Sequence, residues 1–398
     1  MFRSKSWGPR SDAARLRQIY GEDEKLYGYK DLDIDVSGSH DYPLLAPSSI
    51  FTQLRFSSGS LVQYLNVRYS DKLGSSSTVD DVEGTLSDFI PPGYFKDEQK
   101  FLAFVEEDST NFKPSGQLIH SYTRSAPSSA NGKGKGKGAA DSQALDSESE
   151  DAVVFEVYHA TWNTPGFKEY HRRMQLFILL YIEGGSYINE DEDPWEFAVL
   201  FEKRKRKGTP NVASYHFVGY SSLYPFYFFP EKTRLRLSQF VILPPYQHQG
   251  HGSNLYNAIY NHTLSQPNIA ELTVEDPAEA FEDLRDRNDL KMLLSNERLM
   301  EEGFGEAAVT HGGGRVGGVG RAGKSARGGK ELTSAKGKLG PPSDKGWLEK
   351  WRKDLKIGGR QFQRLTEMLL LLRLDPSDAR ALRAYRIQVK ERLYRFNF

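Results

Sequence analysis

The sequence of 398 residues contains no cysteine. Its absence excludes disulfides, thiolate metal sites and any covalent mechanism with a cysteine nucleophile. The formal net charge is zero, because the chain has 53 basic residues (Lys and Arg) and 53 acidic residues (Asp and Glu). The overall charge therefore gives no reason to expect direct nucleic-acid binding, and a charged partner must be bound by a local patch.

Long apolar runs are missing as well. No stretch approaches the roughly 18 consecutive apolar residues of a membrane-spanning helix. The first ten residues, MFRSKSWGPR, lack the apolar centre of a signal peptide. We therefore expect a soluble protein with no membrane partner, which is not exported by the usual route. The nine histidines show no ligand spacing, so no metal site is expected.

Two segments have low complexity. Residues 126–151 contain GKGKGKG followed by SESED, and residues 303–346 are rich in Gly, Lys and Arg. Such compositions bury too little apolar surface to offset the entropy of ordering, so we expect both segments to be disordered. Strand-like sequences at 116–120 and 153–158 flank the first segment, which predicts an expanded hairpin loop within one sheet.

The rest of the chain mixes strand and helix patterns. Strands are expected at 197–201, 214–220, 223–229, 234–243 and 270–274, and helices at 167–182 and 252–264. In the C-terminal part, Trp347, Trp351 and Leu355 share a helix face, and a last helix is expected after Asp375. This order predicts an α+β or α/β protein with helices on the faces of a sheet. The expected division is a mixed α/β domain at 1–112, a second domain at 113–302, a linker at 303–346 and a helical domain at 347–398.

The segment 238–276 carries the most informative pattern. A strand ends at Pro244-Pro245, the loop QHQGHG follows at 247–252, and a helix begins there. Glycines let backbone N–H groups converge, and the positive end of the helix dipole adds to an anion site that suits a pyrophosphate. Proline cannot donate a ladder hydrogen bond, so Pro244 and Pro245 stop the strand from pairing with its next neighbour. The strand then has free backbone groups that can bind an amide-bearing arm such as pantetheine. The alternative is a glycine-rich turn without a ligand, since this loop alone is a weak signal.

Further motifs narrow the interpretation. They are Tyr29-Lys30, Asp80 to Gly84, Ile90 to Gly93, Phe112 to Pro114, Gly219-Tyr220, Pro230 to Arg234, Val274 to Pro277 and Leu284 to Asp286. With the QHQGHG loop, they make the chain similar to the catalytic subunits of type B histone acetyltransferases, within the GNAT superfamily. The resemblance runs from about Gly21 to Phe396, outside the two low-complexity segments. Relatives usually carry a longer segment before the acidic motif at 22–24, so we expect either a truncated start or an N-terminal sheet with one strand fewer.

The resemblance implies a fold, an activity and partners. The fold is α+β: a GNAT acetyltransferase domain with a mixed, mostly antiparallel sheet, preceded by a smaller mixed α/β domain and followed by a small helical domain. The activity is transfer of acetyl from acetyl-coenzyme A to tail lysines of newly synthesised histone H4. The partners are histone H4, often with H3, and a WD40-repeat histone-binding subunit, in the nucleus and cytoplasm.

The reaction requires a general base. A lysine ammonium, with a pKa of about 10.4, must lose a proton before the amine can attack a thioester. By resemblance Glu275 is this base, with Glu183 and Asp276 as supporting candidates. Adjacent carboxylates and partial burial would raise one pKa toward neutrality. The alternatives are that Asp276 caps the next helix and that Glu183 is a solvated residue at a helix end. Without cysteine, direct attack within a ternary complex remains.

The resemblance also assigns ligand contacts. The cofactor residues are Phe240, Val241, Ile242, Gln247, His248, Gln249, Gly250, His251, Gly252, Ser253 and Arg287. Backbone N–H groups near Val241 and Ile242 would polarise the thioester oxygen. The histone-tail residues are Glu22, Asp23, Glu24, Tyr224, Pro225 and Phe226, which offer acidic groups for a basic tail and aromatic walls for a lysine stem. The alternatives are an ordinary surface charge for Arg287, a charged turn for residues 22–24 and an aromatic sheet face for residues 224–226.

Other interpretations stay open. A non-catalytic acyl-coenzyme A-binding or histone-chaperone module would need no base at Glu275, and a different amine acceptor would keep the fold. The P-loop-like sequence at 318–325 has glycines and basic residues on both sides instead of a strand and a helix, so we interpret it as a chance match. The lysines at 133–137 and 315–338 resemble histone tails, which gives the hypothesis that one or more of them is self-acetylated or competes weakly for the substrate groove. A flexible linker is the alternative.

Overall fold

The computed structural model describes residues 17–18, 25–30, 50–69, 82–125, 152–192, 194–206, 209–305 and 337–397. The chain divides into two compact units. Unit 1 comprises Met1–Pro225 and Arg236–Ile259, and unit 2 comprises Phe226–Leu235 and Tyr260–Phe398. The four-part division expected from the sequence stays a prediction.

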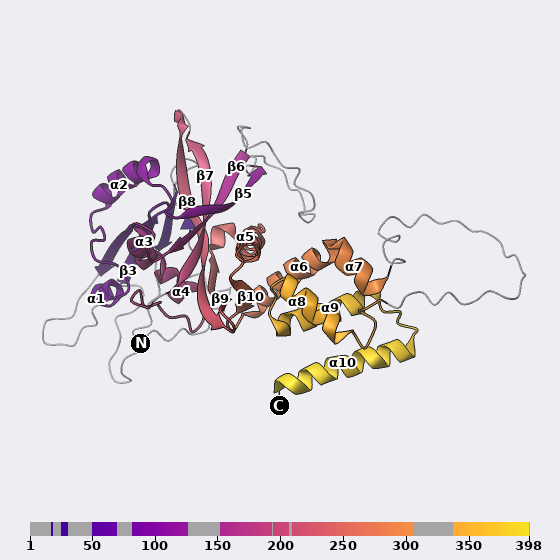
Figure 1. The fold of residues 1–398 in the computed structure, drawn as a ribbon. Coiled ribbons are helices and arrows are strands. Elements are labelled where there is room, and N and C mark those ends of the chain that lie inside the picture. Colours follow the sequence, from indigo (N-terminus) through magenta and orange to yellow (C-terminus); the bar gives the residue numbers. More distant parts are fainter. Residues whose placement is uncertain are drawn as a thin grey trace, which may run out of the picture. The chain divides into compact units, whose positions relative to one another are not determined.

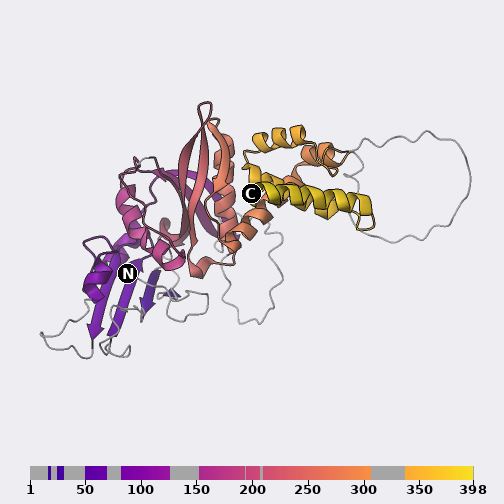
Figure 2. The same cartoon turned by 90° about the horizontal axis from the view of Figure 1, so that it is seen from below.

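A four-stranded antiparallel sheet occupies the N-terminal part of unit 1 (Figures 1 and 2). Its strands follow the chain as β1 (Arg17–Gln18), β2 (Leu26–Lys30), β3 (Ile50–Ser57) and β4 (Gln63–Tyr69). Helices α1 (Val82–Ser87) and α2 (Glu98–Asn111) come next. Asp97 caps α2 by accepting from the Lys100 N–H. The helix buries Phe101 against Tyr64, with ring centroids 5.5 Å apart, so its apolar face completes the core of this sheet.

A second sheet of six strands has the order β10-β9-β8-β7-β6-β5. The strands are β5 (Gln117–Ser125), β6 (Ala152–Thr161), β7 (Glu196–Arg206), β8 (Thr209–Phe228), β9 (Lys232–Ile242) and β10 (Ile269–Val274). The pairs from β5 to β8 are antiparallel, and alternate residues of β9 are buried from Leu235 to Val241, as expected for a strand with one face in the core. Strands β5 and β6 pair on either side of residues 126–151, as the sequence predicted.

The sequence-based boundaries need two corrections. The helix expected at 167–182 is two helices, α3 (Phe167–Met174) and α4 (Leu176–Tyr181), because the Ile178 N–H bonds to the Gln175 carbonyl, one residue short of the α-helical spacing. The two strands expected at 214–220 and 223–229 form the single strand β8. The pairing register between β8 and β7 shifts between Leu200 and Phe201. A local β-bulge of this kind lets β8 continue as one strand where two strands were expected.

Helices make up most of unit 2. Helix α5 (His251–Ser265) ends in it, and α6 (Glu279–Ser295), α7 (Glu297–Phe304), α8 (Lys345–Asp354), α9 (Gly359–Arg373) and α10 (Ala379–Asn397) follow, orange to yellow in Figure 1. The linker expected at 303–346 is ordered at both ends: Leu339 is buried, and its N–H donates to the Gly303 carbonyl at 2.7 Å. Residues 306–336, with the P-loop-like sequence, and residues 126–151 lie outside the described residues.

None of the helices in the described part of the chain combines the length and the apolar character that a bilayer crossing requires.

Candidate active site

The glycine-rich loop follows β9 as the sequence predicted. A 3₁₀ turn, η3 (Pro244–Tyr246), ends the strand, and α5 begins at His251. Between them, residues 247–250 are exposed. His248 and Gly250 have φ angles of 59° and 80°, so two left-handed residues turn the chain toward the helix. The arrangement leaves an exposed loop directly before the N-terminus of a helix, where anions bind.

Two buried aromatic side chains hold the ends of this loop. Tyr246 precedes it and His251 follows it, and their rings meet edge to face with centroids 5.7 Å apart. The Tyr122 hydroxyl lies 2.7 Å from His251 Nδ1. Burial, and next the charge of Arg124, lower the pKa of His251 to about 4, so its imidazole is neutral at pH 7. The His251 side chain therefore belongs to the core, and this residue can offer a ligand only its backbone.

Arg124 supplies a cation beside the loop. Its guanidinium, on β5, donates to the Gln249 carbonyl. The Gln249 side-chain amide in turn donates to the Pro245 carbonyl at 2.8 Å, and Gln247 donates to the Ile242 carbonyl at the same distance. The loop is thus fixed by its own side chains and by β5, which preorganises its backbone.

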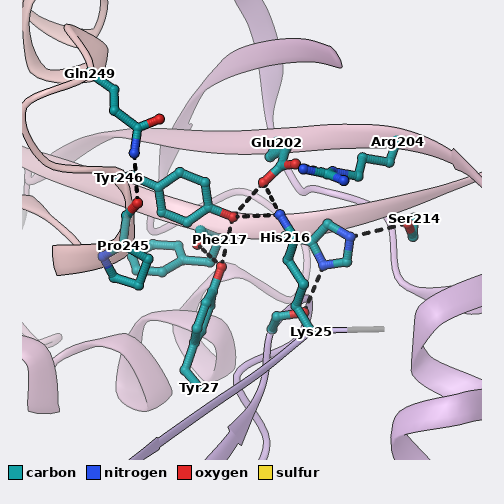
Figure 3. A network of polar contacts seen from close by, with 11 residues as sticks. Lys25, Tyr27, Glu202, Arg204, Ser214, His216, Phe217, Pro245, Tyr246 and Gln249 are labelled. Carbon is teal, nitrogen blue, oxygen red and sulfur yellow. Dashed lines mark hydrogen bonds and ion pairs between the residues drawn. The ribbon is translucent and has the colours of Figure 1, made fainter. Parts of the chain in front are cut away.

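A buried ionic network lies beneath the loop (Figure 3). The Lys25 ammonium and the Tyr246 hydroxyl both donate to the Glu202 carboxylate on β7, and Arg204 bonds to its other oxygen. Burial acts to raise the pKa of Glu202, but Lys25, His216 and Arg204 together lower it to about 2. Burial lowers the pKa of Lys25 to about 8, against the opposing effect of Glu202. Both groups are therefore charged at pH 7.

Sequence reasoning missed this network. Lys25 and Glu202 are 177 positions apart, and no local pattern pairs them. The available signal was Glu202 directly after the continuous apolar run FAVLF at 197–201, because such a run predicts a strand that is buried on both faces and leaves no solvent for the next carboxylate.

The three expected catalytic carboxylates are exposed. Glu275 and Asp276 follow β10 in unit 2, and Glu183 follows α4 in unit 1. The partial burial expected for the pair Glu275 and Asp276 is wrong in this structure. The capping alternative for Asp276 is also wrong, because the N-cap of α6 is Ala278 and no side chain caps it. Their catalytic roles stay predictions.

The remaining assigned residues fall into both units. In unit 1, Val241 is buried, whereas Phe240 and Ile242 are half-buried at the end of β9. Tyr224 and Pro225 are half-buried, and the Tyr224 ring meets Trp195 edge to face at 4.9 Å. In unit 2, Phe226 and Arg287 are exposed. Glu22, Asp23 and Glu24 lie outside the described residues.

Comparisons with known proteins agree with this architecture. Residues 50–183 match the family described as histone acetyl transferase HAT1 N-terminus, residues 170–281 match the acetyltransferase (GNAT) family, and residues 331–375 match the C-terminal region of fungal HAT1. The chain is 48% identical to the histone acetyltransferase type B catalytic subunit of Cryptococcus neoformans, over 96% of this chain and 80% of that protein. The chain belongs to this family.

Other members are similar along most of their length. The type B catalytic subunit of Mycosarcoma maydis is 41% identical, over 95% of this chain and 74% of that protein. The subunit of Mus musculus is 31% identical, over 94% of this chain and 73% of that protein. Among solved structures, an aminoglycoside acetyltransferase in complex with sisomicin matches 34% of this chain and 86% of its own, with 14% identity and a TM-score of 0.25.

Family membership names the cofactor that the loop can be tested against. The chain is an acetyl-coenzyme A-dependent acetyltransferase with a GNAT fold. The residues present fit an anionic cofactor, because the loop at 247–250 is exposed, two left-handed residues shape it, and Arg124 places a positive charge against it. Backbone N–H groups of this loop and of the first turn of α5 would hold the phosphates.

Proposed function

We propose that this acetyltransferase modifies tail lysines of newly synthesised histone H4, with Glu275 as the general base. The observation that carries the proposal is the exposed loop at 247–250, which two buried anchors hold at the start of α5. The loop supports the proposed cofactor site, and the names of the relatives, type B histone acetyltransferases, support a histone substrate.

The reaction follows from the chemistry of its reactants. Glu275 accepts a proton from the lysine ammonium, and the free amine then attacks the acetyl carbonyl of acetyl-coenzyme A. Backbone N–H groups near Val241 and Ile242 stabilise the negative charge on the carbonyl oxygen of the tetrahedral intermediate. The C–S bond then breaks, and the proton that remains on the attacking nitrogen passes to the sulfur, so that coenzyme A leaves as the thiol. No acyl-cysteine intermediate can form, because the sequence has no thiol to carry the acetyl group. Glu183 and Asp276 would support the base.

The substrate contacts follow the same proposal. Acidic groups at 22–24 would attract the basic tail, and the aromatic side chains at 224–226 would contact the aliphatic stem of the lysine. Phe226 is 38% exposed, and Tyr227 and Phe229 beyond it are 74% and 79% exposed, so this region offers aromatic surface to a peptide. Histone H3 and a WD40-repeat subunit would join the complex, in the nucleus and cytoplasm.

An acetyl-transfer assay on a free H4 tail peptide tests the proposal. Replacing Glu275 with Gln should lower kcat by about 10²-fold to 10⁴-fold, the usual effect of a general base. Binding of coenzyme A, measured by calorimetry, should not change. The matched control is Glu279→Gln, which neutralises an exposed carboxylate four residues further on in the first turn of α6.

The assay separates the alternatives. A non-catalytic binding module would bind coenzyme A but transfer nothing in the wild-type protein. A different acceptor would leave H4 peptide unmodified while coenzyme A is still released with another amine. Equal kcat for wild type and Glu275→Gln would reject Glu275 as the base.

A further inference from the structure

The ionic network beneath the loop has a composition that stability alone does not explain. Lys25 and Glu202 are 3% and 1% exposed, and Tyr27 and Tyr246 are buried with them. Taking an ion pair out of water costs about as much as the attraction returns, and apolar replacements often stabilise a protein. A network of this kind therefore suggests a requirement for fixed geometry.

The geometry converges on one hydroxyl. The Tyr246 hydroxyl donates its proton to Glu202, its oxygen accepts from Lys25 at 3.1 Å, and this oxygen lies 3.0 Å from the Tyr27 oxygen (Figure 3). Tyr27 donates to the Phe217 carbonyl at 2.9 Å, which ties this group to β8. Three elements therefore position the tip of a single side chain.

That side chain determines where the cofactor loop begins. Tyr246 is the last residue of η3, and Gln247 starts the exposed loop. Its ring also contacts His251, at the other end of the loop. A displacement of the Tyr246 ring would thus move both ends of the loop, where the backbone N–H groups for the phosphates lie.

We propose that Glu202, acting with Lys25 through the hydroxyl of Tyr246, is a positioning residue for acetyl-coenzyme A. It contacts no reacting atom, and it fixes the base of the loop at 247–250 in its binding conformation. This role rests on the proposed use of the loop as the phosphate site. In this proposal the network controls the affinity for the cofactor and takes no part in removing the proton from the substrate lysine.

The Tyr246→Phe variant tests the proposal with the smallest change. It removes one hydroxyl and keeps the ring against His251. A lost hydrogen bond to a charged group predicts a rise of about tenfold in the KM for acetyl-coenzyme A and in the Kd for coenzyme A. At saturating acetyl-coenzyme A, kcat on the H4 peptide should stay within about twofold, because the chemical groups are untouched.

The matched control is Tyr170→Phe. Tyr170 is also buried, and its hydroxyl donates to the Gly59 carbonyl at 3.2 Å, but it lies on α3 and has no contact with the loop among its described hydrogen bonds and ring contacts. It should lower Tm about as much as Tyr246→Phe and leave the Kd for coenzyme A unchanged. Glu202→Gln keeps an acceptor for Tyr246 and should therefore lose less affinity than Glu202→Ala.

The outcomes are distinguishable. A lower Tm with an unchanged Kd in Tyr246→Phe would make the network purely structural and overturn the proposal, as would a loss of kcat at constant KM. If Glu202 variants do not fold, Lys25→Met provides a second test, with the same expected rise in Kd. Failure of the proposed function would look different, because wild type would then bind coenzyme A without acetylating the peptide.

Discussion

At Gly219, on β8, the backbone of the chain at the end of β9 comes so close that no side chain fits. A Cβ atom at this position would lie 2.2 Å from the Val241 carbonyl oxygen and 2.8 Å from Ile242 Cδ1. These two residues are the expected contacts for the acyl arm of the cofactor. Position 219 therefore requires glycine because it lies directly against the strand that is expected to bind the cofactor.

We predict that Gly219→Ala destabilises the protein by about 1–3 kcal/mol, the usual cost of overpacking, and also raises the KM for acetyl-coenzyme A, because the end of β9 must move. Denaturant unfolding and steady-state kinetics measure the two effects. Gly346→Ala, whose Cβ would be 3.5 Å from Asp344 Oδ1, is the control. Because Gly346 lies in α8, where alanine is the better helix former, this variant should not lose stability, and its KM should not change. Normal cofactor affinity in Gly219→Ala would contradict the assignment of the β9 end.

Single residues were predictable where their neighbours in the sequence determine them. Gly250 and His248 sit in a strand–loop–helix pattern, which fixes their environment locally. Lys25 and Glu202 meet only because Lys25, directly before β2, reaches Glu202 on β7, and a distant pairing leaves no trace in a local pattern. The exposure of Glu275 was missed for the same reason, since burial at the end of a strand depends on what packs against it.

At the scale of elements, one lysine joins three parts of unit 2. Lys356, after α8, donates from Nζ to the carbonyls of Thr263, Leu264 and Gln266 at the end of α5, the nearest at 2.5 Å. Its own carbonyl accepts from the Leu272 N–H of β10 at 2.8 Å. The last carbonyls of a helix have no partner within the helix, so a cation at this end satisfies them and interacts favourably with the helix dipole.

Lys356→Met should therefore lower the free energy of unfolding by about 1–3 kcal/mol, since several carbonyls lose a charged donor. Thermal or denaturant unfolding measures the change. Lys353→Met removes a cation from the last turn of α8, three residues before Lys356, but Lys353 is exposed and its Nζ lies 3.5 Å from Glu349, so the expected loss is below about 1 kcal/mol. Equal losses in the two variants would show that the contacts of Lys356 do not stabilise unit 2.

Elements were predictable to the extent that periodicity defines them. The alternation along β9 and the spacing in α5 gave both elements within a few residues. The break at Gln175 could not be predicted, because the apolar pattern continues through it and the turn depends on hydrogen bonds such as the one from the Ile188 N–H to the Gln175 side chain. The ends of the linker were missed because Leu339 is a single apolar residue in a Gly- and Lys-rich stretch.

For the molecule as a whole, three buried histidines contribute to the loss of stability in acid. Burial is the main cause that lowers the pKa of three histidines in unit 1. It lowers the pKa of His171 to about 3, against the opposing charge of Glu190. The pKa of His216 falls to about 3 and that of His251 to about 4, where the positive charges of Lys25 and Arg124, respectively, lower it further. Both ring nitrogens of His171 lack a hydrogen-bond partner among the described residues, and Trp162 and Phe197 pack against it.

The sign of the effect follows from linkage. Each folded pKa is below the value of about 6.5 in the unfolded chain, so the unfolded state binds protons first as the pH falls. The free energy of unfolding is therefore highest above pH 6.5 and falls below it, by up to about 1.4 kcal/mol per pH unit for each histidine, until the folded pKa is reached. Denaturant unfolding at pH 7.5 and 5.5 should show this decrease.

His171→Phe isolates one of the three contributions. The substitution removes a buried polar ring whose nitrogens have no described partner and keeps an aromatic ring among Trp162 and Phe197, so stability at pH 7.5 should not fall. The difference in free energy between pH 7.5 and 5.5 should shrink by about 1.4 kcal/mol, the share of one proton. An unchanged difference would mean that His171 takes up its proton in the folded state, which requires water or a partner to reach the ring before the protein unfolds.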